Sequence, residues 1–527
     1  MTKSIAQSQT TFFSLQGIRP ATAATGIILL TTLFRFFFVA AGALDLSPDE
    51  SQYWDWSRDL QLSYYSKGPL VTLLISFWTS IFGNTELGVR VGAVVNTMLI
   101  QVVLYWGVAR VWNRPRLALW TLFIANTMPL FMAAGVLMTT DNPLILCWTI
   151  CLFLLHRMSS DRFGRFDTVL FGVFLALGIL AKYMMLAFVP VAVLFYLILS
   201  RAGLLAGGAW TRLMSGLTLG LCGGFLPIFV WNMQNDWVGF RHVFSLGGLS
   251  GGDEPLIRFD RFPEYLGSQI LLLTPWWFVF LLWGAVRAAR NHAQSGGLPF
   301  GLTFRQRTIL LCAFWPVWLF FLVWSFHTAI YPNWSAVSYI GGILLVAPAW
   351  ESFWQRATSL WKRVWISLSI AVFLLVHLGP FLPLPAEYNP MHRLTGWDDL
   401  GATIQSLKRS EFDHPDRVFL LSDRYGVTAG LSFYVPGQDR AYNVDEGRRM
   451  TQYDLWPGPQ DKKGWDAVYV RKDWEENITP EVKRMFDRIG KRIELQTRHN
   501  GKKGRKFTLW LLYEYNGYWP DRKTESY

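Results

Sequence analysis

The stretch LDLSPDESQYWDWSRDLQLSYYSKGPL, residues 44–70, places several carboxylates and one lysine directly after a long apolar run. That run, residues 21–43, is long enough to cross a bilayer, which takes about 20 apolar residues. It ends in Ala41-Gly42-Ala43 like a cleavable signal peptide, but a long polar segment precedes it, so we expect a retained first span. We expect Arg35 in this span to face the bundle interior or an interface.

The composition predicts a polytopic α-helical membrane protein. Of 527 residues, 52% are hydrophobic and 16% are charged, whereas soluble domains carry about 25% charged residues. The 27 tryptophans and 39 phenylalanines are typical of the aromatic belts of membrane proteins. The net charge of +12 does not indicate nucleic acid, because the basic residues are spread between apolar segments.

Eleven segments are predicted to span the membrane, and the loops between them differ in charge. The spans are 21–43, 89–109, 117–135, 142–156, 167–181, 183–200, 213–231, 266–286, 308–326, 334–350 and 364–382. Basic residues fall on alternate loops, which the positive-inside rule places in the cytoplasm. The N-terminus is then cytoplasmic, and the tail from about 383 is outside, in the periplasm of a bacterium. The apolar segment 69–83 is short, so we expect an interfacial or re-entrant helix.

The tail has a different character from the rest of the chain. It carries charges throughout and has strand-like runs at 417–422, 466–471, 491–498 and 506–515 beside a helical pattern at 398–409. This alternation predicts a small α/β domain. We therefore expect a membrane module over 1–382, with a first external loop at about 44–88, and a soluble domain over 383–527.

Four cysteines all lie in apolar runs, and none lies in the tail, where we expect no structural disulfide. Cys147 and Cys151 are four residues apart on one helix face. Packing explains this spacing better than a zinc site, which would need four polar ligands.

The unusual polar residues gather in the predicted external loops. Carboxylates lie at Asp49, Glu50 and Asp141, and lysines at Lys67 and Lys182. Each has a structural explanation of its own, because an acid at a helix start meets the helix dipole and a lysine can snorkel. Their recurrence at one membrane depth favours a functional site.

This set of residue types suits one kind of chemistry. A carboxylate can act as general base on an acceptor hydroxyl, and lysines can neutralise a phosphate, including one that leaves. Tryptophan and tyrosine can stack on sugar rings and line lipid tails. Together they indicate sugar transfer from a lipid phosphate.

Several motifs carry a resemblance to a known family. SPDESQYWDWS and YYSKGPL resemble the first external loop of GT-C superfamily glycosyltransferases of the family 39/83 type. That group includes the lipid A aminoarabinose transferase and, more distantly, protein O-mannosyltransferases. Further matches are TTDNPL, LAKYMM, WNMQNDWVGFRHVF, YPNW and, in the tail, SDRYGVTAGLSFYVPG and RRMTQYDLWPG.

The resemblance implies a GT-C fold with about eleven or more transmembrane helices, interfacial helices in the first external loop and a C-terminal periplasmic α/β domain. It implies an inverting transferase that uses a sugar on polyprenyl phosphate, in bacteria undecaprenyl phosphate. The implied catalytic acidic residues are Asp49, with Glu50 beside it, and Asp141, and the donor phosphate would be bound by Lys67 and Lys182. The expected substrate contacts are Tyr53, Trp54, Tyr64, Tyr65, Arg241, His242, His327, Tyr331 and Asn333.

The chain also departs from the family pattern. Ser66 stands where the aminoarabinose transferase has an acidic residue. The metal site of that transferase is therefore not expected in this chain, and the role of a divalent cation stays open. The histidine pair of that relative is not evident in residues 249–260. The glycine-rich segment 247–255 is either a mobile lid or a plain flexible loop. The QYDLW motif, residues 452–456, contacts the acceptor, buttresses the lid or has a purely structural role.

The acceptor and the sugar are left open by the sequence. Lipid A or lipopolysaccharide is the first choice of acceptor, and a protein or another envelope polysaccharide is the alternative. From a different class, a lipid or solute transporter would place its polar groups near the midplane with repeated halves, a pattern not seen here. We expect a multi-pass protein of the bacterial inner membrane, in contact with membrane lipids.

Overall fold

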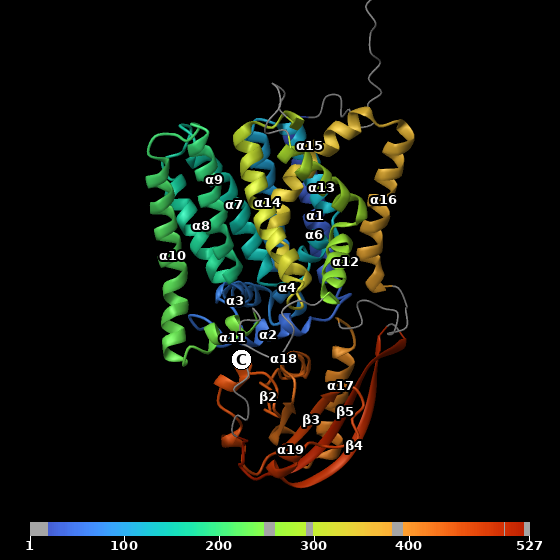
Figure 1. Ribbon diagram of the computed structural model, residues 1–527. Coiled ribbons are helices and arrows are strands. Elements are labelled where there is room, and N and C mark those ends of the chain that lie inside the picture. The colour runs from blue at the N-terminus through green and yellow to red at the C-terminus, as the bar shows by residue number, and fades with distance from the viewer. Residues whose placement is uncertain (1–18, 247–258, 291–298, 382–393, 500, 521–527) are drawn as a thin grey trace, which may run out of the picture.

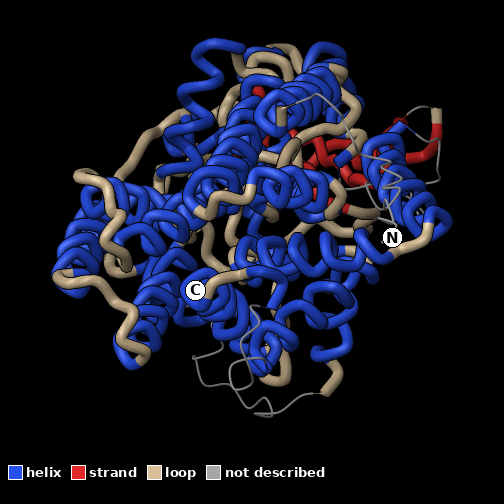
Figure 2. Tube along the Cα trace, turned by 90° about the horizontal axis from the view of Figure 1, so that it is seen from above, coloured by secondary structure: helices blue, strands red, loops and turns tan. Residues whose placement is uncertain are grey.

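A helical bundle and a smaller sheet domain make up the protein (Figure 1). The computed structural model describes residues 19–246, 259–290, 299–381, 394–499 and 501–520. The proposed lid at 247–255 and the residue range 249–258 therefore lie outside the described residues. Seen from the end opposite the sheet, the helices form a broad array, and the strands gather beneath one side of it (Figure 2).

The helices of the bundle follow the predicted spans in order. Their bounds are α1 Pro20–Ala40, α2 Pro48–Ser57, α3 Leu70–Phe82, α4 Glu86–Trp106, η1 Gly107–Val111, α5 Pro115–Asn126, α6 Pro129–Ala134, α7 Asp141–Met158, α8 Asp167–Ala181, η2 Tyr183–Ala187, α9 Phe188–Arg201, α10 Ala209–Gln234, α11 Val238–Leu246, α12 Arg261–Leu273, α13 Pro275–Arg290, η3 Pro299–Gly301, α14 Phe304–Trp324, η4 Pro332–Ser335, α15 Ser338–Arg356, α16 Ser359–Leu378 and η5 Gly379–Phe381.

Fewer of these helices than predicted meet the length and apolarity of a membrane span. Within the described residues there are six, or seven if the pair α12 and α13, bent by 100°, counts as one span. The count of eleven is therefore not confirmed. The predicted span 117–135 is broken into α5 and α6, because Pro129 disfavours a helical conformation at Met128, which is extended.

The first span carries a buried cation, as the sequence suggested. Arg35 of α1 is buried and donates a hydrogen bond to Asn126 Oδ1 of α5 at 2.7 Å. It faces the interior of the bundle. The four cysteines are free thiols; Cys147, Cys151 and Cys312 are buried and Cys222 is exposed.

The sheet domain contains five strands in the order β2-β1-β3-β5-β4. Pairs of β1 with β2 and β3 are parallel, and β5 runs antiparallel to β3 and β4. Its elements are α17 Trp397–Glu411, η7 Pro415–Arg417, β1 Val418–Ser422, α18 Tyr425–Tyr434, β2 Tyr442–Asn443, η8 Gln452–Leu455, η9 Gln460–Lys462, β3 Asp466–Lys472, α19 Pro480–Met485, β4 Phe486–His499 and β5 Lys502–Tyr515. The four predicted strands and the helix at 398–409 are confirmed. Among the described strands, the two-residue β2 was not predicted, and helices α18 and α19 were not named in advance.

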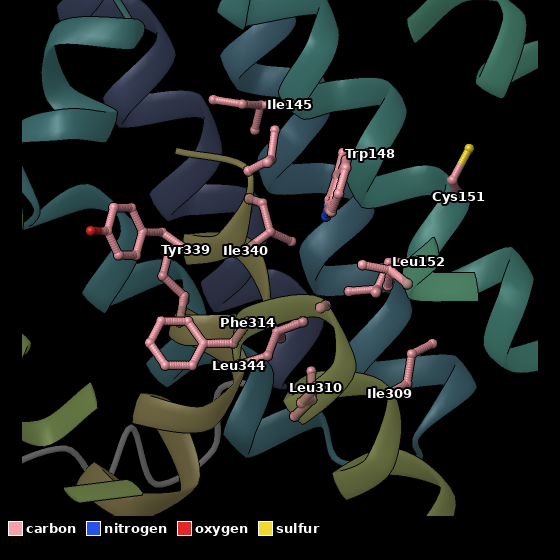
Figure 3. Packing of buried hydrophobic residues seen from close by; sticks show 14 of the residues in the cluster. Ile145, Trp148, Cys151, Leu152, Ile309, Leu310, Phe314, Tyr339, Ile340 and Leu344 are labelled. Carbon is pink, nitrogen blue, oxygen red and sulfur yellow. The ribbon is translucent and has the colours of Figure 1, made fainter. Parts of the chain in front are cut away.

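The largest apolar core holds the helices that carry the polar residues of interest. Side chains of α7, α14 and α15 pack together in it, including Trp148, Phe314 and Ile340 (Figure 3). Because α7 begins at Asp141 and α15 follows the YPNW turn, this core fixes the turns that precede these two helices relative to each other.

The sheet domain is attached to the bundle through the segment between α1 and α4, which carries α2 and α3. Helices α2, α3, α11 and α18 lie between the two parts (Figure 1). Asp45 accepts a hydrogen bond from the Trp397 amide at 2.6 Å. A Cβ added to Gly426 of α18 would lie 2.8 Å from Pro48 Cβ of α2, so the two helices meet without room for a side chain there.

Candidate active site

Three of the predicted site residues from separate turns meet in one cluster. The Lys182 ammonium pairs with Asp141 Oδ1 at 2.7 Å, and Asn333 donates to Asp141 Oδ2 at 2.6 Å. Asp141 is the first residue of α7, where its charge also meets the positive end of the helix dipole. Lys182 directly follows the last residue of α8, where a cation is favoured by the negative end of that helix dipole. The structure thus confirms that these loops converge.

Asp49 lies in the first turn of α2, on the side that faces the sheet domain. Ser47 caps this helix and Pro48 opens it, which fixes the start of the helix. The Asp49 side chain is exposed and accepts a hydrogen bond from the Tyr425 hydroxyl at 3.2 Å. One oxygen of this carboxylate is thereby oriented by a residue of the sheet domain.

Glu50, the neighbour of Asp49, is fully buried and points the other way. Its carboxylate accepts bonds from Arg90 at 2.8 and 2.9 Å, from the Ser47 amide at 2.9 Å and from the Met138 amide at 2.9 Å. Arg90 also donates to the backbone oxygens of the loop before α2. These contacts occupy both oxygens of Glu50, so its geometry is that of a group that positions α2.

Lys67 is half-buried and lies within electrostatic reach of the other charged groups. Burial and the nearby Lys182 lower its pKa to about 8, while Asp49 and Asp141 act in the opposite direction. Within the described part of the chain, no carboxylate lies within salt-bridge distance of its ammonium. The next residue, Gly68, touches α8, since a Cβ there would lie 2.1 Å from the Leu180 carbonyl oxygen.

Lys67 and Lys182 both line a large cavity. The cavity has a volume of about 670 Å³ and is otherwise almost entirely apolar. Its lining comes from the α8–α9 turn, α9, α11 and α14, including Tyr183, Val191, Phe320 and Trp324. The cavity therefore joins two cations to an apolar space between membrane helices.

The remaining predicted residues divide into two groups. Tyr65 and His242 lie near Lys67, with their rings 4.5 Å apart, and Tyr53 lies near Asp49 and Asp141. Tyr331 is exposed beside Tyr425.

The others lie in structural surroundings. Trp54 packs on Phe433 and donates to Asn84, and Tyr64 stacks on Trp56 and donates to backbone oxygens. Arg241 is exposed on α11, and the His327 ring packs on Trp324.

Sequence reasoning missed two residues of the sheet domain, Tyr425 and Arg449. Tyr425 bonds to Asp49, and Arg449 lies close enough to Lys67 and His242 to lower the pKa of both. Both residues belong to tail motifs noted for their resemblance, but a motif alone does not tell which of its side chains faces the bundle. The QYDLW segment holds the domains together, because Gln452 accepts from the Tyr65 amide at 2.7 Å and Tyr453 donates to Asp55 at 2.9 Å.

The described residues contain no group of three or more His, Cys, Asp or Glu side chains placed to hold a metal ion. The described residues therefore add no candidate metal ligands to those considered from the sequence.

Comparison with known proteins bears out the resemblance. Residues 66–231 match the family described as dolichyl-phosphate-mannose-protein mannosyltransferase. The lipid A galacturonosyltransferase RgtD of Rhizobium johnstonii is 26% identical over 320 residues, which cover 60% of this chain and 63% of that protein. The undecaprenyl phosphate-alpha-4-amino-4-deoxy-L-arabinose arabinosyl transferase of Edwardsiella ictaluri is 26% identical over 301 residues, 52% of each chain. The matches thus span less than two thirds of these relatives.

The fold is shared with a solved membrane enzyme. ArnT from Cupriavidus metallidurans, in its structure bound to undecaprenyl phosphate, superimposes with a TM-score of 0.64 and 15% identity. The superposition covers 93% of this chain and 98% of that chain. The similarity to GT-C glycosyltransferases predicted from the motifs is confirmed, and the chain has the ArnT fold.

Proposed function

We propose that the protein is an inverting glycosyltransferase that moves a monosaccharide from undecaprenyl phosphate to lipid A or lipopolysaccharide. The observation that carries this proposal is the cavity of about 670 Å³, whose lining combines Lys67 and Lys182 with apolar side chains. A polyprenyl phosphate has two matching parts, an anionic head and a long hydrocarbon tail. The relatives support the same reading, since the name of one contains lipid A as the acceptor and the name of the other contains undecaprenyl phosphate as the sugar carrier.

Asp49 acts as the general base in this proposal. Its carboxylate is exposed toward the junction of the two domains, and Tyr425 orients one oxygen, which leaves the other for an acceptor hydroxyl. The hydroxyl proton moves to Asp49 as the hydroxyl oxygen forms a bond to the anomeric carbon. The bond between that carbon and the phosphate oxygen breaks on the opposite face, so the configuration inverts.

Lys67 stabilises the phosphate that leaves. The phosphodiester of the donor carries one negative charge and the released phosphate carries a second, so a nearby cation favours the transition state over the bound donor. Lys67 suits this role because no carboxylate in the described residues pairs with it, whereas the charge of Lys182 is balanced by Asp141. In this proposal Asp141 and Lys182 shape the phosphate site as a pair, and Glu50 positions α2 through Arg90.

The proposal includes a membrane topology. Residues 1–382 form the membrane module and 383–527 the soluble domain, with the N-terminus in the cytoplasm of a bacterium. The site and the soluble domain face the periplasm, and α2 and α3 lie along that membrane surface. The amphiphilic donor and acceptor reach the site from the lipid, and the soluble domain covers it.

Sugar transfer by purified protein tests the proposal. Radiolabelled undecaprenyl-phosphate sugars, both neutral and acidic, are supplied with lipid A in detergent, without a membrane gradient. We expect label in lipid A with wild type and a loss of at least 100-fold with Asp49→Asn, since general bases contribute about 10²–10⁴-fold. Asp59→Asn is the matched control, because Asp59 lies in the same loop and bonds only to Gln61 through its side chain in the described residues.

Two results would overturn this reading. Full activity of Asp49→Asn would remove Asp49 as the base. Absence of transfer from every lipid-linked donor to lipid A, while a known transferase works in the same assay, would remove lipid A as the acceptor and direct the search to protein or polysaccharide acceptors.

A further inference from the structure

We infer that the soluble domain completes the donor site, with Arg449 as a second anion-binding cation beside Lys67 and Tyr425 as the residue that positions Asp49. This inference rests on the proposed function. It extends that function, because it assigns substrate binding to the sheet domain, which the sequence predicts as a unit separate from the helical bundle. Arg449 also takes over the binding of the donor phosphate, a role that the family resemblance assigned to Lys182. The charge of Lys182 is neutralised by Asp141 at 2.7 Å.

The backbone on both sides of Arg449 is fixed. Arg448 forms a double ion pair with Asp454, with both distances 2.8 Å. Met450 is buried against Tyr65 and Trp231 of the membrane module. A residue between two such anchors has its position set before substrate arrives, which lowers the entropy cost of binding.

The Arg449 side chain itself is exposed and open. Among the described residues no acceptor pairs with its guanidinium. Its charge acts on Lys67, which lines the cavity, and on His242 and Tyr425. Two cations that repel each other are stabilised together when an anion binds between them. The His242 ring lies within the same group and stays neutral, because burial and these two cations lower its pKa to about 3.

The anionic oxygens that Arg449 binds belong to the donor. They come from its phosphate or, if the transferred sugar is acidic, from the sugar carboxylate. Arginine recognises both groups through the same two-pronged hydrogen bonds. The experiment below separates these two sources.

Tyr425 acts on Asp49 in a different way. Its hydroxyl donates to Asp49 Oδ1 at 3.2 Å, and the helix that carries it packs directly on α2, where Gly426 approaches Pro48. The tyrosine therefore restricts the rotation of the carboxylate, and Asp49 presents its other oxygen. It is a positioning residue, so its loss should lower kcat and leave the donor affinity unchanged.

Equilibrium binding of undecaprenyl phosphate to the purified full-length protein tests the role of Arg449 without relying on transfer. We expect Arg449→Gln to raise the Kd about tenfold, equivalent to about 1.4 kcal/mol, and Arg449→Lys to restore part of the affinity. Arg417→Gln is the control, because it removes the same charge from an exposed position of the same domain whose side chain has no recorded contact in the described residues. Donor analogues with neutral and acidic sugars are measured in the same way.

Each outcome decides the inference. Weaker binding of undecaprenyl phosphate by Arg449→Gln assigns the phosphate, and weaker binding of the acidic-sugar donor alone assigns the carboxylate. Equal affinities of Arg449→Gln, Arg417→Gln and wild type for all three ligands would overturn the role of Arg449, even if transfer by wild type is normal. For Tyr425→Phe, an unchanged kcat, or a Kd that rises while kcat holds, would overturn its positioning role.

Discussion

Gly68 is the point where the loop that carries Lys67 touches the helix that ends at Lys182. A Cβ at this position would lie 2.1 Å from the Leu180 oxygen and 2.7 Å from the Leu180 carbonyl carbon. Ordinary contact begins at 3.4 Å, so in Gly68→Ala the two backbone segments must separate by about 1.3 Å, the difference between 3.4 and 2.1 Å. Neither neighbour can rotate away, because both atoms belong to the backbone.

The displacement moves apart the two lysines that line the cavity. A misplacement of about 1 Å in a catalytic site can cost on the order of 100-fold in rate, so we expect kcat/KM of Gly68→Ala to fall by about that factor. Overpacking of this kind also destabilises a fold by about 1–3 kcal/mol. The assay is transfer of labelled sugar from undecaprenyl phosphate to lipid A, together with the thermal unfolding midpoint in detergent.

Two glycine substitutions separate the site effect from general destabilisation. In Gly220→Ala the new Cβ would meet the flexible Leu175 side chain at 2.5 Å, away from the lysines, so stability should fall while kcat/KM is kept. In Gly267→Ala nothing lies within 4 Å of the new Cβ, and neither quantity should fall. Wild-type kcat/KM in Gly68→Ala, or an equal loss in Gly220→Ala, would refute the reasoning.

Three further predictions test the charges of the site. Burial and Lys182 lower the pKa of Lys67 to about 8, so kcat/KM should fall as the pH rises through that value and the ammonium loses its proton. Lys67→Arg should not show this fall, because a guanidinium stays charged. Identical pH profiles of the variant and wild type would count against the role of Lys67 at the phosphate. Glu50→Gln leaves the buried Arg90 charge unpaired, so unfolding in detergent should become easier by about 3–5 kcal/mol; an unchanged unfolding midpoint would contradict this. The effects of Asp141→Asn and Lys182→Met on kcat/KM should be non-additive in a double-mutant cycle, with a coupling energy of at least about 0.5 kcal/mol. Additive effects would show that the ion pair at 2.7 Å plays no joint role in the reaction.

The sequence could predict that the loops carrying Asp141, Lys182 and Asn333 converge, but not how each carboxylate is used. Asp49 and Glu50 are adjacent in one motif, and on a helix adjacent residues point in different directions. The structure turns Glu50 inward to Arg90, forty positions further along the chain, and leaves Asp49 exposed. No local pattern reveals this, because the partner of Glu50 is brought near by the packing of α4. The break at Met128, in contrast, had a visible signal in Pro129.

The same distinction explains why the sheet domain was treated as a separate unit. Its strands could be predicted because alternation and β-branched residues are local signals. The faces by which it docks depend on contacts between distant segments, such as Gln452 with the Tyr65 amide. Tyr425 and Arg449 face the bundle only because that docking is set, so sequence patterns within the tail could not identify them.

Helix α2 shows why the docking matters for the proposed chemistry. A helix of ten residues is marginal by itself, yet it carries the proposed base. From the bundle, Arg90 holds it through Glu50, and from the sheet domain Tyr425 holds Asp49 while Gly426 packs on Pro48. Since the two sides hold different residues of the first turn of this short helix, neither alone fixes the carboxylate. The position of the base is therefore a property of the interface between the helical bundle and the sheet domain.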